Sequence, residues 1–278
     1  MSRGRLLLVL ATISSLGLAA VALLGGPVPP PFVVGLVLLF YFSVLGIGAL
    51  VPSWEMYGDV LWKVPGASGC VALTFDDGPD PASTTRVLDV LAKRGARATF
   101  FVLGERAERH PAILRRMIED GHSIGLHSFD HNRLYAFLPP SSVRADIERC
   151  RAIVEAATGV RPLWFRPPVG QMSPRTARGV ILAQAETVGW SVRARDGLRG
   201  TSPDDALRRI EPKLESGAIV LLHDAWERPS AEDGEDPAGA RALDALLDAL
   251  ERRSLQAVSL DELVARGSEE SKALSGAS

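Results

Sequence analysis

The chain has 278 residues, of which 46% are hydrophobic and 23% are charged. That length is enough for one large domain or two small ones with a substantial core. The 31 basic and 33 acidic side chains nearly balance, which argues against a nucleic-acid-binding protein held by bulk positive charge. Only two cysteines are present, which excludes a small domain stapled by disulfides.

The first 54 residues account for the slightly positive mean hydropathy of +0.11. Their only charged side chains are Arg3 and Arg5, and two apolar runs occupy residues 6–24 and 32–51 on either side of a Gly- and Pro-rich turn. Each run is long enough for a helix to cross a hydrocarbon core of about 30 Å. We therefore predict a membrane-anchoring region over residues 1–54, built as a transmembrane helical hairpin. The alternative is a signal peptide followed by a buried core helix.

The positive charges near the first apolar run indicate how the chain is oriented in the membrane. Arg3 and Arg5 favour a cytoplasmic N-terminus, and a complete hairpin returns the chain to the cytoplasmic side. A domain facing outward needs one net crossing, with the other run re-entrant or lying at the interface. The sequence thus predicts attachment to a bacterial-type inner membrane and leaves the side of the following domain open.

From residue 70 onward, short apolar runs alternate with amphipathic, helix-like stretches. Strands that alternate with helices pair in parallel, in an α/β barrel or an open doubly wound sheet. We place a linker at residues 55–69, the folded domain at 70–266 and a disordered tail at 267–278. The seven predicted strands cover residues 70–75, 98–102, 122–126, 163–165, 187–190, 218–222 and 256–258.

Charged residues follow several of these strands, where the functional groups of parallel α/β proteins collect. Asp76 and Asp77 follow the first strand, and adjacent buried carboxylates repel each other unless a cation is present. His127 and His131 follow the third strand. Their four-residue spacing predicts a helical turn with both imidazoles on one face, as metal-binding pairs require. The alternatives are a simple Asp-Gly-Pro turn and two unrelated surface histidines.

Two further side chains lie at the same predicted edge. Arg166 comes before a proline pair and offers a planar fork for a carboxylate. His223 ends the sixth strand, and its ordinary pKa of about 6.5 suits proton transfer near neutrality. The alternative for His223 is a core histidine with satisfied hydrogen bonds.

Taken together, these residues predict a hydrolytic metal site. Asp77, His127 and His131 make a two-histidine, one-carboxylate set that fits catalytic Zn²⁺, with Fe²⁺ and Co²⁺ as alternatives. Asp76 remains free as a base and His223 as an acid. Such a set of groups performs metal-assisted hydrolysis.

Five ordered motifs make the sequence similar to the polysaccharide deacetylase family, carbohydrate esterase family 4. The likeness spans residues 70–263 and rests on the motifs TFDDGP, HSFDH, RPPVG, WSVRARDG and LLHD. The resemblance implies a distorted (β/α) barrel of about seven parallel strands, preceded here by the helical hairpin. It implies a metal-dependent hydrolase of carbon–nitrogen bonds that removes acetyl groups from N-acetylhexosamine units of a glycan or lipid-linked glycan.

The resemblance also implies a role for each motif residue. The three metal-ligand candidates would hold a divalent ion. Asp76 would be the general base and Arg166 would anchor it. His223 would protonate the departing amine, and Asp196 would orient and tune His223.

Two substrate contacts are implied in the same way, and the chain departs from the family pattern near them. The backbone N–H of Val169 would help hold the oxyanion, and Leu221 would line the pocket for the acetyl methyl group. Members often carry tyrosine where this chain has Val169, and tryptophan where it has Gly197. Because aromatic faces commonly cover sugar rings, these departures change the surface that meets the sugar.

Two other functions remain open from the sequence. One is a deacylase or deformylase of a smaller or lipid-linked amide, and the other is a non-catalytic, metal-stabilised carbohydrate-binding module. The expected partners are an N-acetylated sugar polymer or a lipid-linked sugar and the membrane, with no nucleic acid. The acidic segment at residues 227–240 is either a lid over the site or a solvated loop.

Overall fold

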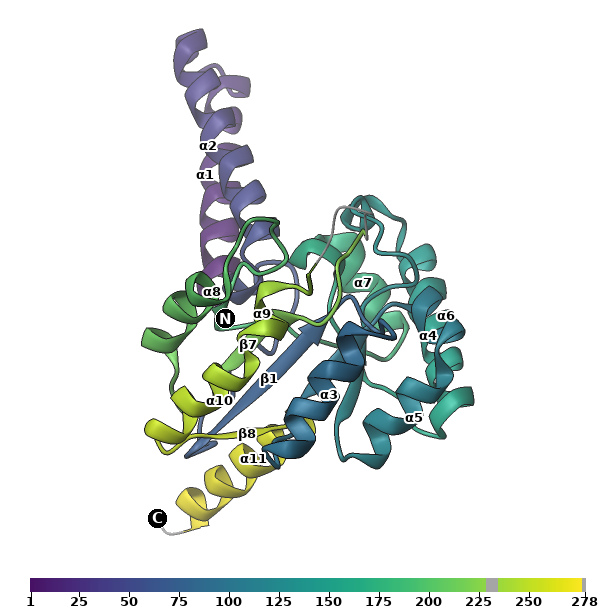
Figure 1. Cartoon of the computed structure of the whole chain (residues 1–278). Helices are drawn as coiled ribbons and strands as arrows, with labels where there is room; N and C mark the ends of the chain where they lie inside the picture. Colours follow the sequence, from purple (N-terminus) through teal and green to yellow (C-terminus); the bar gives the residue numbers. More distant parts are fainter. Residues whose placement is uncertain (229–234, 277–278) are drawn as a thin grey trace.

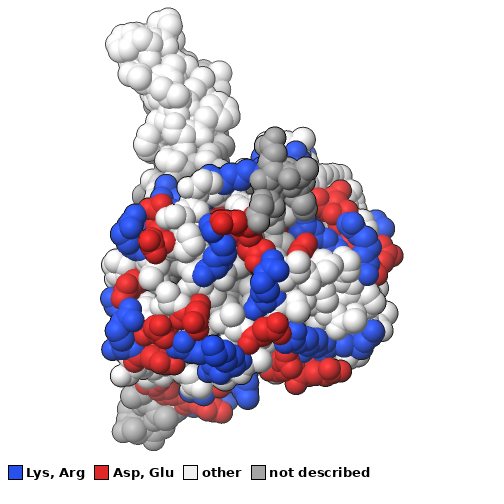
Figure 2. Space-filling view, in the orientation of Figure 1, with Lys and Arg blue, Asp and Glu red and all other residues white. Residues whose placement is uncertain are grey.

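The computed structural model describes residues 1–228 and 235–276. Two antiparallel helices, α1 (Arg3–Leu23) and α2 (Pro31–Leu50), form the predicted hairpin and project from the domain (Figure 1). Both are long and apolar enough to cross a membrane, and few of their side chains are buried. Charged side chains of both signs cover the domain but not the projecting hairpin (Figure 2).

A parallel sheet forms the centre of the domain. Its order is β5-β4-β3-β2-β1-β7-β6, with β8 beside β1, so the sheet is open between β5 and β6. This arrangement confirms the predicted distorted barrel and adds β6, which was missed. The strands are β1 (Cys70–Asp76), β2 (Thr99–Val102), β3 (Ser123–Leu126), β4 (Trp164–Phe165), β5 (Glu186–Thr187), β6 (Val192–Arg193), β7 (Ile219–His223) and β8 (Gln256–Val258).

Helices cover the sheet because each presents one apolar face to it. Every residue of β1 is buried, and α3 (Ser83–Lys93) packs Val87, Leu88 and Leu91 into the same core. Burial of each such side chain contributes about 1.5–3 kcal/mol. The other helices are α4 (Gly104–Arg109), α5 (Pro111–Glu119), α6 (Pro140–Thr158), α7 (Pro174–Leu182), α8 (Pro203–Ile210), α9 (Ala238–Arg241), α10 (Leu243–Arg252) and α11 (Leu260–Gly276).

The segment predicted as a linker, residues 55–69, lies along the open edge of the sheet instead of hanging free. Leu61 donates its N–H to the carbonyl of Thr187 at 2.9 Å, and Val64 donates to Gly217 at 2.9 Å. Val64 is buried. A sheet edge leaves unpaired backbone groups that need covering, and this segment supplies the partners.

The C-terminal tail also differs from the prediction. Residues 267–276 continue α11, where disorder was expected over 267–278, and residues 277–278 lie outside the described part of the chain. Ser68 donates its hydroxyl to Glu270 at 2.8 Å, and Arg266 pairs with Glu262 at 2.6 Å within the helix. These contacts hold a polar sequence in helical form.

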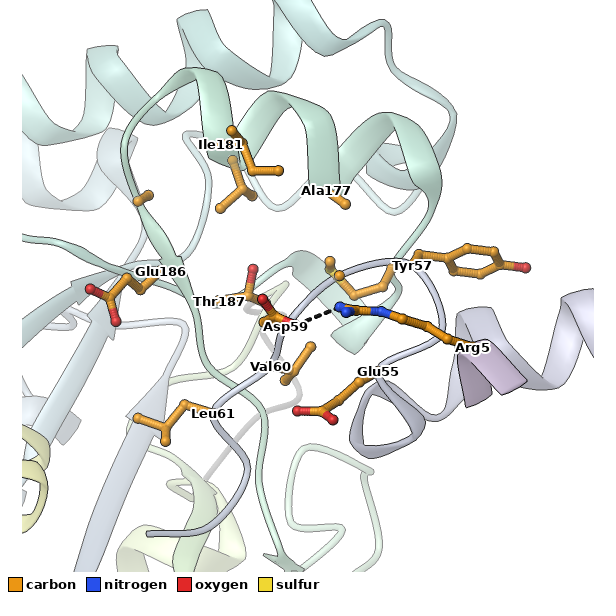
Figure 3. A pocket seen from close by; sticks show the side chains of 14 residues that line it. Arg5, Glu55, Tyr57, Asp59, Val60, Leu61, Ala177, Ile181, Glu186 and Thr187 are labelled. Atoms are coloured by element: carbon orange, nitrogen blue, oxygen red, sulfur yellow. Dashed lines mark hydrogen bonds and ion pairs between the residues drawn. The ribbon is translucent and has the colours of Figure 1, made fainter. Parts of the chain in front are cut away.

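The hairpin is bonded to the domain at its base. Tyr57 donates its hydroxyl to the carbonyl of Leu45 at 2.8 Å, and Met172 donates its N–H to the carbonyl of Ala49 at 3.0 Å. Figure 3 shows the ion pair that the Arg5 side chain makes with an aspartate at this junction, beside a cavity of about 640 Å³ under α7. None of the residues predicted to be catalytic lines this cavity.

Candidate active site

The TFDDGP turn places two carboxylates at the C-terminal end of β1. Asp76 is the last residue of the strand, and Asp77 follows with a φ of 78°. Asp224 fixes the turn, because its Oδ1 accepts the N–H of Gly78 at 3.1 Å and its Oδ2 accepts the Thr84 hydroxyl at 2.5 Å. A Cβ at Gly78 would lie 2.1 Å from Asp224 Oδ2, so the close approach requires glycine. Burial raises the pKa of Asp224 to about 7.

A buried arginine supports the same turn from the other side. Arg106 of α4 donates from Nη1 to the carbonyl of Asp77 at 2.8 Å and from Nη2 to the carbonyl of Trp226 at 2.7 Å. It therefore ties the turn after β1 to the segment after β7. The sequence analysis missed Arg106, because nothing in the helical pattern around it distinguishes it from the chain's other arginines.

Asp77, His127 and His131 come together as a buried group whose ligand atoms all lie within 4.8 Å of one another. Asp77 Oδ1 lies 3.6 Å from Nε2 of each histidine and has no hydrogen-bond partner. His127 donates from Nδ1 to the carbonyl of Arg166 at 2.8 Å, which leaves the lone pair of Nε2 free. Burial lowers the pKa of His127 and favours the neutral ring that metal ligation needs. This set of donors fits a divalent cation.

The two histidines meet by a different route from the one predicted. Residues 127–131 form an irregular loop, with φ of 69° at Ser128 and 55° at His131. The prediction of a helical turn is therefore wrong. The Ser128 hydroxyl accepts the N–H of His131 at 3.1 Å, and Gly104 donates its N–H to the Ser128 carbonyl at 3.0 Å. These contacts bring the two imidazole rings to 5.1 Å between centroids.

Asp76 forms a buried ion pair with Arg166. Arg166 Nη1 donates to Asp76 Oδ1 at 2.7 Å and to the Thr74 hydroxyl at 2.9 Å, while Nη2 donates to the carbonyl of Gly189 at 2.9 Å. The guanidinium lies 4.1 Å from the centre of the Phe101 ring. Burial lowers the pKa of Arg166, and the neighbouring Asp76 opposes that shift. Asp76 is thereby held in one orientation at the end of β1.

His223 and Asp196 form a second pair at the same edge. Asp196 accepts the His223 backbone N–H on Oδ2 at 2.7 Å, and its Oδ1 lies 3.0 Å from Nδ1 of the ring. Burial by itself lowers the pKa of His223, but the charge and hydrogen bond of Asp196, together with the charges of Asp77 and Asp76, outweigh burial and raise that pKa to about 10. A Cβ at Gly197 would lie 3.0 Å from Nε2 of His223, so glycine leaves this nitrogen accessible.

Seven of the nine predicted site residues line one cavity of about 410 Å³. The other two, Arg166 and Asp196, lie behind Asp76 and His223 and bond to them. Val169 lines the cavity with a φ of 56° and a half-exposed side chain, and Leu221 lies two residues before His223 on the same face of β7.

Glu227 is a further lining residue that the sequence analysis did not single out. Its Oε1 lies 3.1 Å from His131 Nδ1, outside hydrogen-bond alignment, and accepts from Arg133 Nε at 2.7 Å. The hydrogen bond from Arg133 lowers the pKa of Glu227. Glu227 begins the acidic segment predicted as a lid or a solvated loop, of which residues 229–234 lie outside the described part of the chain.

The chain is similar to known proteins in both sequence and fold. The family model described as polysaccharide deacetylase matches residues 63–188. The chain is 34% identical over 213 residues to a peptidoglycan-N-acetylglucosamine deacetylase of Bacillus cereus, covering 76% of this chain and 95% of that relative. The chain belongs to the polysaccharide deacetylase family. A chitooligosaccharide deacetylase of a Bradyrhizobium strain is also 34% identical, with 74% of this chain and 94% of that relative covered.

Two solved structures share the fold. Peptidoglycan deacetylase PdaC from Bacillus subtilis superposes with a TM-score of 0.65 at 30% identity, covering 76% of this chain and 98% of that one. A family 4 acetyl xylan esterase from Clostridium thermocellum, solved in complex with a cobalt ion, superposes with a TM-score of 0.62 at 35% identity. The match covers 70% of this chain and 89% of that one. Membership confirms the expected enzyme class, a hydrolase that acts on carbon–nitrogen bonds.

Proposed function

We propose that this polysaccharide deacetylase is a zinc-dependent N-deacetylase that removes acetyl groups from N-acetylhexosamine units of a glycan or lipid-linked glycan. One observation carries the proposal. The buried metal-ligand group, with its unpartnered Asp77 Oδ1, opens into the same cavity as Asp76 and His223, each of which has a charged partner behind it. The names of the two relatives, both N-acetylated-sugar deacetylases, support the substrate class.

The proposed mechanism divides the proton transfers between two sides of the cavity. Asp77, His127 and His131 would hold the zinc ion, which when bound polarises the amide carbonyl and lowers the pKa of a water molecule. Asp76 takes a proton from the attacking water, and Arg166 holds the carboxylate in one orientation. On the other side, the His223 imidazolium gives a proton to the departing amine.

Two further residues of the cavity, Val169 and Leu221, contact the acetyl group in the proposed mechanism. The backbone N–H of Val169 contributes a hydrogen bond to the developing oxyanion. Leu221 provides an apolar surface for the acetyl methyl group. The products are acetate and a free amino sugar.

Asp77→Asn tests metal dependence and activity together. We expect the wild-type chain in detergent micelles to bind about one zinc ion and to release acetate from N-acetylglucosamine oligomers. The variant should bind less than about a tenth of that amount and release no acetate, because an amide replaces the charged ligand. Elemental analysis and an acetate assay give the two readouts. Asp89→Asn, at an exposed position of α3, is the matched control and should behave as the wild type. Full activity in Asp77→Asn with no metal would contradict the proposal.

The His223 pair gives an expected pH dependence. Because Asp196, with smaller contributions from Asp77 and Asp76, raises the pKa of His223 to about 10, the imidazolium persists until the pH rises through that value. Asp196→Asn removes the charge while burial, which lowers the pKa, remains. The alkaline limb of kcat/KM should therefore move to lower pH by at least one unit, relative to the wild type and to Asp204→Asn at an exposed position of α8. If the alkaline limb of kcat/KM in Asp196→Asn stays at the wild-type pH, His223 is excluded as the general acid.

We also propose that residues 1–54 anchor the chain in the inner membrane and that the domain lies on the cytoplasmic side. The support is that both ends of the hairpin meet the domain, so N-terminus and domain lie on the same side, and Arg3 and Arg5 favour the cytoplasm. A fluorescent reporter at the C-terminus should be bright, and a phosphatase fused after Pro27, at the hairpin turn, should be active. Phosphatase activity from a C-terminal fusion would reverse the assignment.

A further inference from the structure

Two arginines on the wall of the catalytic cavity have no partner. Arg193 ends β6 and Arg195 follows it, and both side chains are exposed and line the cavity. Within residues 1–228 and 235–276, neither guanidinium makes a hydrogen bond or an ion pair. The third lining arginine, Arg133, is bonded to Glu227. The wall formed by β6 and the turn after it therefore carries two uncompensated positive charges.

These charges lie close to the reaction centre. Arg193 is in register with Leu221 of β7, two residues before His223. Arg195 has a φ of 60° and stands two residues before Gly197, whose missing side chain leaves room beside the His223 ring. Paired guanidinium groups bind oxyanions through several charge-assisted hydrogen bonds, and phosphate suits their fork geometry. A phosphate held by this wall would lie beside the sugar in the same cavity.

The rim of the cavity is apolar where it continues toward the hairpin. We define the apolar rim as Leu134, Phe137, Val169 and Leu198, which are 65%, 69%, 53% and 62% exposed. Val169 and Leu198 line the cavity mouth.

Hydrogen bonds connect this rim to the hairpin base. Ser173 donates its hydroxyl to the carbonyl of Ala136, and its neighbour Met172 donates to the carbonyl of Ala49 at the end of α2. In Figure 1, the hairpin rises from the upper side of the domain, toward which β1 also points. Large exposed apolar side chains beside a membrane-crossing hairpin favour contact with a bilayer surface.

We propose that Arg193 and Arg195 bind the phosphate of the substrate, and that the substrate is an N-acetylated sugar joined through this phosphate to a lipid in the bilayer. The inference rests on the proposed function and narrows its substrate class. The cavity binds the sugar, and the wall that carries Arg193 and Arg195 binds the phosphate. The apolar rim contacts the surface of the bilayer that holds the lipid chain.

Binding to the full-length chain in nanodiscs tests the arginine wall without requiring turnover. The probes are N-acetylglucosamine 1-phosphate and N-acetylglucosamine, titrated by calorimetry. Each charge-assisted hydrogen bond contributes about tenfold to a hundredfold in affinity, so the phosphate probe should bind at least tenfold more tightly than the neutral one. Arg193→Gln with Arg195→Gln should abolish that preference. Arg115→Gln with Arg178→Gln, two exposed arginines outside the cavity, should retain it. Equal binding of both probes by the wild type would overturn the proposal.

Turnover identifies the source of the phosphate. The same sugar phosphate, supplied either free or as a long-chain alkyl phosphodiester in nanodiscs, should show at least tenfold higher kcat/KM in the lipid form. Phe137→Ser with Leu134→Ser should lower that advantage several-fold. A free sugar phosphate turned over as well as the lipid form would overturn the lipid assignment. Absence of acetate release from every substrate would instead overturn the proposed function, and the binding result would stand separately.

Discussion

Asp76→Asn is expected to lower kcat by about 10²–10⁴-fold while zinc content stays at the wild-type level, because general-base catalysis typically contributes that much. Asparagine keeps the shape of the side chain and can still accept from Arg166, but it cannot take a proton from water. Asp76 lies outside the metal-ligand group, so the loss should appear in the chemical step and leave ligation intact.

The measurement is acetate release from the full chain in micelles, with elemental analysis of the same samples. Asp89→Asn controls for the loss of one carboxylate elsewhere, since that residue makes only an exposed ion pair. A kcat within threefold of the wild type would exclude Asp76 as the base. A loss of zinc together with activity would assign it to ligation instead.

Arg166→Met should lower the free energy of unfolding by about 3–5 kcal/mol, the largest stability effect that we expect at the site. Removing one partner of a buried ion pair leaves the other charge buried and uncompensated. Here the remaining charge is Asp76, whose side chain is only 5% exposed. Urea unfolding of the full chain in detergent, followed by tryptophan fluorescence, measures the loss.

A double-mutant cycle separates the charge effect from lost packing. Asp76→Asn combined with Arg166→Met should be clearly more stable than the sum of the single losses predicts, because no charge is then left unpaired. Arg151 provides the matched control: it is also buried, but among residues 1–228 and 235–276 its hydrogen bonds go to the carbonyls of Pro162 and Ala183 and to no carboxylate. Arg151→Met should therefore show no such coupling with Asp76→Asn. Strict additivity for the Arg166 cycle would contradict the ion-pair interpretation.

The sequence pattern predicts the edge at which the site lies, because parallel strands end together. Asp76 and His223 are the last residues of strands that are adjacent in the sheet, although 147 positions separate them in the chain. Strand bounds are accurate where an apolar run is long, as in β1. They fail at β6, whose two residues make too short a run to distinguish from a loop.

Other features could not be predicted, because distant contacts determine them. Ser128 and His131 adopt left-handed backbone conformations in a loop that α4 stabilises, so the spacing of the two histidines alone indicated the wrong local structure. Arg106 and Glu227 contact the metal-ligand residues or their backbone, yet each lies in a segment whose local pattern has a simpler explanation. The segment 55–69 pairs with a sheet edge that exists only once the domain is folded.

The direct bonding of α2 to the loop after Val169 has a consequence for how substrate is encountered. A domain on a long flexible linker samples a wide volume above its anchor, and its search is three-dimensional. Here the hydrogen bond between Ala49 and Met172 joins the loop beside the cavity directly to the hairpin. For the proposed membrane anchor and lipid-linked substrate, encounter would then depend on lateral diffusion, so turnover should follow the surface density of substrate in the bilayer rather than its concentration in bulk solution.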